Sequence, residues 1–224
     1  MLLLCDESTR YKVKIIGAIS ISVESFLQFE NYALEQRVKQ NVYGEVKWQK
    51  VGCRGKYFDF YIDLVTKLFS FPEVRFHSNS YEGHHYKAGY ALLRSIVWKL
   101  QNARIPTGIY ILHDKSNYSE IKTIKEYLRV DRRVKREIVL CEEIKSETFV
   151  TLGVVDILAG CTSFVLNKVS ENAESESNLV KADFITGLEN KVNNGIPFGV
   201  SISKLWDYSS DNLFQNFALH DRGM

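Results

Sequence analysis

The chain has 224 residues, of which 45% are hydrophobic and 25% are charged. This length and apolar content are enough for one large or two small domains with a buried core. The formal net charge is only +2, so the overall charge does not indicate a nucleic-acid-binding protein, and any basic surface must be local.

The first part of the chain is expected to start with a β-hairpin and a helix. Residues 2–8, LLLCDES, begin as a buried strand and run directly into two acids. Residues 12–22 are rich in β-branched residues and predict a second strand, which STRY connects to the first. Apolar positions near helical spacing predict a helix over 24–40, with Ser22 as its N-cap.

Later segments alternate between helical and strand patterns. Residues 44–56 are ambiguous between strand and loop, 57–70 predict a helix, and 74–80 predict a strand. The second half continues in the same way: helix 84–101, strand 108–114, helix 119–128, strand 136–142 and helix 149–166. This alternation is typical of an α/β layered domain with parallel strands.

The stretch 170–178, SENAESESN, is acidic and serine-rich and predicts a loop. We therefore expect a domain over 1–168 and a C-terminal extension over 169–224, packed on it or beside it. GVSISKLWDY at 199–208 could instead form a dimer contact, although simple packing on the core explains it equally well.

No membrane contact and a cytoplasmic location are expected. MLLLCDESTR is too short and too soon acidic for a signal peptide. Residues 149–166 approach membrane length, but Asp156 lies at their middle, so they are expected to form a buried helix. The four cysteines have no C-x-x-C or other tight metal-ligand spacing, and they fit a reducing compartment. They are Cys5, Cys53, Cys141 and Cys161.

Three aspartates occupy unusual places. Asp6 and Asp114 each end an apolar strand, and Asp156 is a lone acid in an apolar helix. Ligands of open α/β sheets bind at the carboxyl ends of strands, so these acids are expected to converge. Taken singly, a strand-end Asp is also a common turn former or helix cap, and Asp156 could pair with a cation.

Convergent carboxylates repel one another, and the usual remedy is a hard divalent cation, Mg²⁺ or Mn²⁺. This is the electrostatic arrangement of two-metal phosphodiester cleavage. A glycosidase-type acid pair also uses two carboxylates, but it needs no third. Candidates for a fourth acid are Glu7, Glu45 and Glu143, with Glu45 favoured because it lies in GEVKWQKV beside bases and an aromatic residue.

A basic and aromatic group close to Glu45 predicts substrate contacts. Lys47 is expected to orient a phosphate, and Trp48 could stack on an unpaired base, which would suit RNA or single strands. Further contacts are expected from Glu7, Lys50 and Lys115. The basic run 120–136 could also grip phosphates, although such a run is more often a solvated helix face.

Several short pieces of the chain resemble, in order and spacing, the family called domain of unknown function 3800. They are DES at 6–8, GAISIS at 17–22, E-x-K-W at 45–48, the strand-end Asp114, and Ser146 followed by an apolar helix with DILAG at 156–160. The resemblance spans residues 2 to 168. It implies an RNase H-like fold, a mixed sheet flanked by helices.

The resemblance also implies a set of site residues. Asp6, Glu45, Asp114 and Asp156 would be the acidic, metal-binding and catalytic cluster, with Glu7 and Lys47 beside it. Two positions depart from the family pattern: Thr9 replaces the glycine of DESG, and Gly153 stands where the family has a Gln before the last Asp.

The sequence therefore predicts a metal-dependent nuclease that hydrolyses phosphodiester bonds with Mg²⁺ or Mn²⁺, with nucleic acid as its substrate. Prokaryotic antiviral defence or a toxin module is the setting that the resemblance implies, with a partner protein or a homodimer possible. The alternative is a catalytically inactive RNase H-like module that binds nucleic acid or protein.

Overall fold

The computed structural model describes most of the chain. The described residues are 1–10, 12–53, 55–81, 85–102, 108–115, 121–132, 134, 137–167, 169, 175–192 and 217–220. Residues 199–208, considered above as a dimer contact, lie outside them.

A mixed sheet of six strands forms the centre of the described structure, in the order β5-β4-β1-β2-β3-β6. Strands β1, β2 and β3 pair antiparallel, β4 is parallel to β1, β5 is parallel to β4, and β6 is parallel to β3. The strands are β1 (Leu2–Ser8), β2 (Lys14–Ile21), β3 (Arg75–Tyr81), β4 (Ile109–Asp114), β5 (Ile138–Ile144) and β6 (Phe217–His220). The predicted hairpin is confirmed as the antiparallel pair of β1 and β2.

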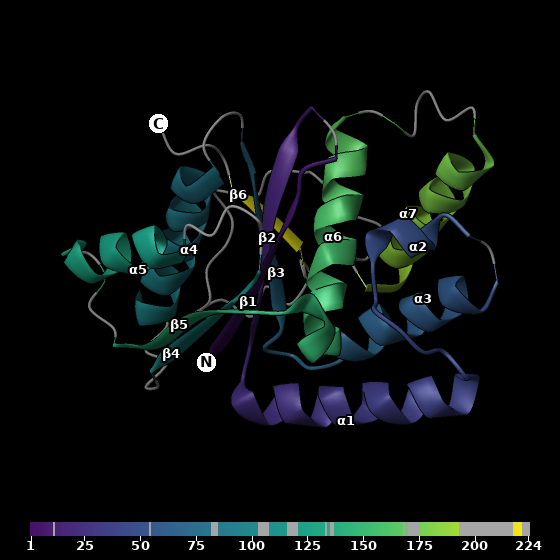
Figure 1. Cartoon of the computed structure of the whole chain (residues 1–224), viewed down its shortest axis with the longest axis horizontal. Coiled ribbons are helices and arrows are strands. Elements are labelled where there is room, and N and C mark those ends of the chain that lie inside the picture. Colours follow the sequence, from purple (N-terminus) through teal and green to yellow (C-terminus); the bar gives the residue numbers. More distant parts are fainter. Residues whose placement is uncertain are drawn as a thin grey trace.

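Helices cover both faces of the sheet, and each face has its own apolar core (Figure 1). Helices α4 and α5 lie on one face, and α1, α2, α3, α6 and α7 lie on the other. They are α1 (Val23–Gln40), α2 (Trp48–Val51), α3 (Lys56–Leu68), α4 (His85–Asn102), α5 (Ile121–Val130), α6 (Val150–Leu166) and α7 (Glu176–Val192). The predicted α/β class, a mixed sheet flanked by helices, is confirmed.

Two segments differ from the sequence-based expectation. The ambiguous stretch 44–56 contains the short helix α2. The loop prediction for 170–178 is wrong at its end, because α7 begins at Glu176. Ser175 accepts the backbone N–H of Asn178 at 3.3 Å and so caps the helix. Acidic and serine residues that indicate a loop are also the residues that start a helix.

Helix α6 is the central helix of its layer and packs on β1 and β2. Most of its residues are buried, as predicted for 149–166. Its first turn is capped by Glu30 of α1, whose carboxylate accepts the N–H groups of Val150 at 3.0 Å and Thr151 at 2.8 Å. A carboxylate at a helix N-terminus accepts hydrogen bonds from the free N–H groups there and interacts favourably with the helix dipole. Among the described residues, no helix is long and apolar enough to cross a membrane.

Glycines allow other segments to approach α6 closely. At Gly17 of β2, a Cβ atom would lie 2.8 Å from the Phe76 ring and 3.2 Å from Cβ of Ala159. A Cβ at Gly153 would overlap the carbonyl oxygen of Val46, and one at Gly160 would overlap the Trp48 ring. The segment that carries Val46 and Trp48 therefore lies directly against the backbone of α6.

Gly153→Ala tests this close packing. Alanine favours a helix over glycine by about 1 kcal/mol, but here it forces the Val46 backbone away, which costs about 1–3 kcal/mol or more. We expect a net loss of about 1–2 kcal/mol of unfolding free energy in urea denaturation. The matched control is Gly187→Ala in α7, where the nearest atom would lie at an ordinary 3.5 Å; it is expected to be neutral or stabilising. Equal stability of the two variants would contradict the packing argument.

Candidate functional site

Asp6 and Asp114 lie side by side at the carboxyl ends of two parallel strands. The register pairs Cys5 of β1 with His113 of β4, so the next residue of each strand is one of the two acids. Leu4 and Leu112 belong to the core beneath α6. Because side chains alternate along a strand, both aspartates face the same way as these leucines, toward α6.

Asp156 reaches the same place from α6. Its Oδ2 accepts the backbone N–H of Trp48 at 2.7 Å. Burial raises the pKa of Asp156 to about 6, and the carboxylates of Asp114 and Glu45 add to the rise. The Trp48 N–H and the Lys47 ammonium lower this pKa and so oppose the rise. The acid therefore sits among other acids in a site that solvates charge poorly.

The pKa values of the other two aspartates are raised as well. Burial raises the pKa of Asp6 well above its usual range, and Asp156 and Asp114 add to the rise. The backbone N–H of Glu7, which donates to Asp6 Oδ1 at 2.7 Å, opposes it. Burial also raises the pKa of Asp114, against the Lys115 backbone N–H and the charges of Lys47 and His113.

Glu45 and Lys47 complete this cluster from the loop before α2. The Lys47 ammonium lies 2.9 Å from Oε1 of Glu45, and the Ser146 hydroxyl donates to the same oxygen. Burial alone would raise the pKa of Glu45, but the Ser146 hydroxyl, Lys47 and Lys50 lower it below its usual value. Burial would lower the pKa of Lys47, but Glu45, Asp156 and Asp114 raise it.

Two of the candidate acids lie elsewhere. Glu7 follows Asp6 on β1 and therefore points to the opposite face, where its carboxylate accepts the Tyr81 hydroxyl at 3.1 Å. Glu143 pairs with His113 and is two residues from Cys141, which belongs to the core under α4 and α5. Of the three candidates for a fourth acid, only Glu45 lies with the aspartates.

Trp48 is a core residue, which corrects its expected role in base stacking. It is 3% exposed, and its ring contacts Phe164 edge to face at 5.8 Å between centroids. The ammonium of Lys181 on α7 lies 4.9 Å from the ring centroid. The ring leaves no face for a base, and the contribution of Trp48 to the site is its backbone N–H.

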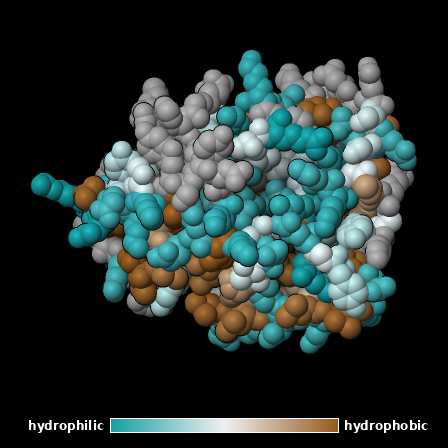
Figure 2. Space-filling view, in the orientation of Figure 1, coloured by the Kyte–Doolittle hydropathy of each residue, from teal (hydrophilic) through white to brown (hydrophobic). Residues whose placement is uncertain are grey.

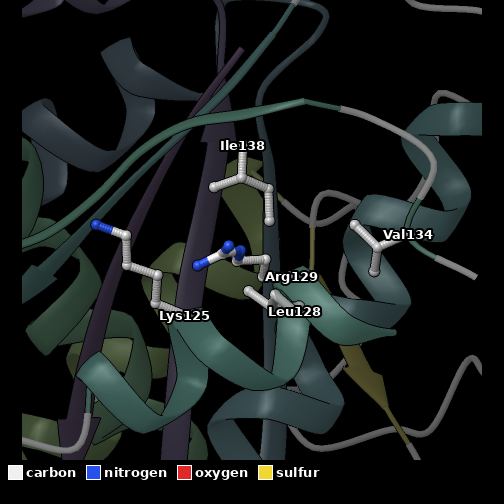
Figure 3. Close-up of a pocket in the computed structure, with 5 residues that line it drawn as sticks. All are labelled: Lys125, Leu128, Arg129, Val134 and Ile138. Atoms are coloured by element: carbon white, nitrogen blue, oxygen red, sulfur yellow. The ribbon is translucent and has the colours of Figure 1, made fainter. Parts of the chain in front are cut away.

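The remaining basic residues are distributed over two regions. Lys50 donates to the Glu45 carbonyl oxygen at 2.6 Å, next to the acids, and the Lys115 side chain is exposed after the end of β4. The described part of the basic run 120–136 forms a hollow of about 210 Å³ on the opposite face of the sheet, with Lys125 and Arg129 extending from α5 (Figure 3). The hollow is lined by Lys125, Leu128, Arg129, Val134 and Ile138.

Three residues with a part in this arrangement were not assigned one from the sequence. Ser146 is a landmark of the family resemblance, and its hydroxyl holds Glu45. Glu30 caps α6 and fixes the helix that carries Asp156. Lys181 is 2% exposed. Nothing in the helical pattern of α7 distinguishes this lysine from a surface residue, so no sequence signal could have found it.

A scan against protein-family models finds no match for this chain, and searches of curated proteins and of solved structures find none either. The acidic cluster is therefore the feature of this chain that bears most directly on its function.

Asp156→Asn tests the cost of burying an ionised acid in the cluster. An acid whose pKa is raised in the folded state destabilises the fold above that pKa, and the penalty disappears when the acid is protonated. Asparagine can still accept the Trp48 N–H. In buffer that contains a metal chelator, the free energy of unfolding of the variant is therefore expected to exceed that of the natural chain by about 1–3 kcal/mol at pH 7.5. The difference should vanish toward pH 4.

Urea denaturation across this pH range measures the effect. Glu147→Gln, at a side chain 71% exposed, is the control and should change stability little at any pH. A variant that is less stable than the natural chain at pH 7.5 would show that the ionised Asp156 does not destabilise the fold.

Proposed function

We propose that the chain is a divalent-metal-dependent nuclease that hydrolyses phosphodiester bonds. The observation that supports this most strongly is the convergence of Asp6, Asp114 and Asp156 from three elements, with each pKa raised. Burying three acids together costs stability when they are ionised, and this favours a functional role over a structural one.

The topology supports an RNase H-like assignment within this proposal. Apart from the edge strand β6, the strand order is β3-β2-β1-β4-β5, with β2 antiparallel to its neighbours and β4 and β5 parallel to β1. This is the order that an RNase H-like sheet would require. The acids come from the first strand, the fourth strand and a late helix, as the resemblance to the family of domain of unknown function 3800 implies. Fold alone does not establish an activity, and the proposal therefore depends on the acids.

The chemistry of the donor set fits Mg²⁺ or Mn²⁺. Carboxylate oxygens are the ligands that hard divalent cations take, and a cation would stabilise the ionised form of these acids, whose pKa values are raised chiefly by burial. Within the described ranges, however, no three His, Cys, Asp or Glu side chains form a group that could hold a metal ion. The fit is one of donor chemistry, and the ligands are not preassembled.

Asp6, Asp114 and Asp156 would hold the metal, with Glu45 beside them. The bound metal would neutralise charge on the scissile phosphate and lower the pKa of an attacking water molecule. Lys47, kept charged by its acidic neighbours, would contact a phosphate oxygen of the substrate, and Glu45 and Ser146 position it.

Gly153 has a structural explanation that leaves this proposal intact. The family pattern has a glutamine at this place, but here a side chain of any size would overlap the backbone of Val46. The space of the missing amide is thus taken by the segment that carries Glu45 and Lys47. The departure changes how that segment is held and removes none of the acids.

A second candidate function is a non-catalytic module that binds nucleic acid or protein. The observation in its favour is that the Lys47 ammonium already lies among the carboxylates and partly compensates them. In such a module the lysine would be the permanent counter-ion and no metal would bind. Metal binding therefore separates the two candidates.

Asp114→Asn is the test of catalysis. Labelled single-stranded and duplex DNA and RNA are incubated with the natural chain and Mg²⁺ or Mn²⁺, and we expect metal-dependent cleavage that falls about 100-fold or more in the variant. Asp59→Asn, an exposed aspartate on α3, is the matched control and should cleave like the natural chain. Cleavage that survives in Asp114→Asn would overturn the assignment of the site.

Thermal stability tests metal binding without any substrate. A ligand at 100 times its dissociation constant stabilises the folded state by about 2.7 kcal/mol. Millimolar Mn²⁺ should therefore raise the melting temperature of the natural chain and of Asp59→Asn, and should leave Asp6→Asn unchanged. The same melting temperature with and without Mn²⁺ in all three proteins, together with no cleavage, would favour the non-catalytic module.

A further inference from the structure

Helix α1 carries a stripe of exposed aliphatic side chains along one side. The exposed fractions are 44% for Val23, 56% for Leu27, 54% for Leu34 and 69% for Val38. Figure 2 shows hydrophobic residues gathered along the edge of the molecule that α1 forms in Figure 1. Single exposed hydrophobic residues are common on proteins, but an aligned set of four on one helix is a candidate contact surface.

The stripe is separate from the face that holds α1 on the protein. At 100° per residue, the four side chains fall within about 60° of one another around the helix axis. The face that buries Phe26, Phe29 and Ala33 in the core is centred about 120° away around the axis. A surface helix needs one apolar stripe to pack on its own domain, and α1 has a second one.

We propose that α1 is a homodimer interface, packed antiparallel against α1 of a second copy. A two-fold axis between Glu30 and Asn31 places Leu27 opposite Leu34 of the other copy and Val23 opposite Val38. Every member of the stripe then meets another member, as the self-complementary interface of a two-fold dimer requires. This inference concerns a surface that contains none of the clustered acids, and it does not depend on the proposed activity.

The charges on α1 favour the antiparallel direction. Glu24 lies in the first turn, and Arg37 and Lys39 lie in the last. The proposed register places Glu24 level with Arg37 of the partner, and two residues from the level of the partner's Glu35. The guanidinium of Arg37 also donates to the Gly44 carbonyl oxygen at 2.9 Å. The antiparallel direction also aligns the two helix dipoles favourably. A parallel copy would bring Glu24 against Glu24 and the basic ends together.

Asn31 lies next to the proposed axis, and its side chain is exposed. A carboxamide has both a donor and an acceptor, so two copies of the same residue can bond to each other across a two-fold axis. A polar residue at the centre of an apolar helix pair also disfavours shifted registers, in which it would meet a leucine.

The size of the surface predicts a weak dimer. A helix of 18 residues is about 27 Å long, and one face of it offers a few hundred Å², below the ~800 Å² per partner of a stable interface. We expect a dissociation constant of about 1–100 µM, with monomer at low concentration and dimer at high concentration.

Sedimentation equilibrium of the full chain from about 1 to 300 µM, spanning that range, tests the proposal. Leu27→Glu and Leu34→Lys should each be monomeric throughout. The antiparallel register also predicts that the two variants complement each other, because residue 27 faces residue 34 of the partner. An equimolar mixture of the two variants should form a heterodimer, and the double variant Leu27→Glu/Leu34→Lys should dimerise again.

The control is Leu179→Glu on α7, where the natural leucine is also half-exposed, at 50%; it should dimerise like the natural chain. Circular dichroism checks that every variant is folded. A natural chain that stays monomeric up to 300 µM, or a dimer that persists in both single variants, would overturn the proposal. If Leu27→Glu no longer dimerises with itself and the mixture of the two variants also forms no heterodimer, the antiparallel register would be overturned.

Discussion

Close contact between α6 and its neighbours is the constraint on which the rest of the arrangement depends. Asp156 can lie near Asp6 only if the helix approaches the sheet, and Gly17 of β2, the cross-strand neighbour of Asp6, provides that approach. The loop before α2 can present Glu45 and Lys47 only if it lies against the helix, which Gly153 and Gly160 permit. The position of four charged groups is thus set by the absence of three side chains.

Stability and the acidic cluster are in conflict in this protein. The raised pKa values of the aspartates mean that the fold is less stable when they are ionised. The backbone N–H groups of Trp48 and Glu7 and the Lys47 ammonium offset part of this cost. The remaining loss of stability is compensated by the large buried core of the sheet and helices around the acids.

The sequence predicted much of the fold and of the site, because both have local signatures. Alternating and helical patterns defined most elements, and acids at the ends of apolar strands indicated Asp6 and Asp114. The burial of Trp48 could not be predicted in this way, because an aromatic residue beside lysines gives the same sequence pattern whether it is exposed or buried. Glu7 adjoins Asp6 in sequence, and only the alternation of the strand separates the two. The burial of Lys181 depends on the packing of α7, which has no local signal.

The candidate site is distributed over distant parts of the chain, which has a consequence for folding. Leu2 of β1 pairs with Tyr110 of β4 in parallel, and Asp156 arrives later still on α6. Contacts between residues so far apart in sequence form slowly and only with the rest of the core. A growing polypeptide lacks the complete set of acids until α6 has been synthesised and docked. The acidic cluster therefore exists only in the finished fold, and partly made chains lack it.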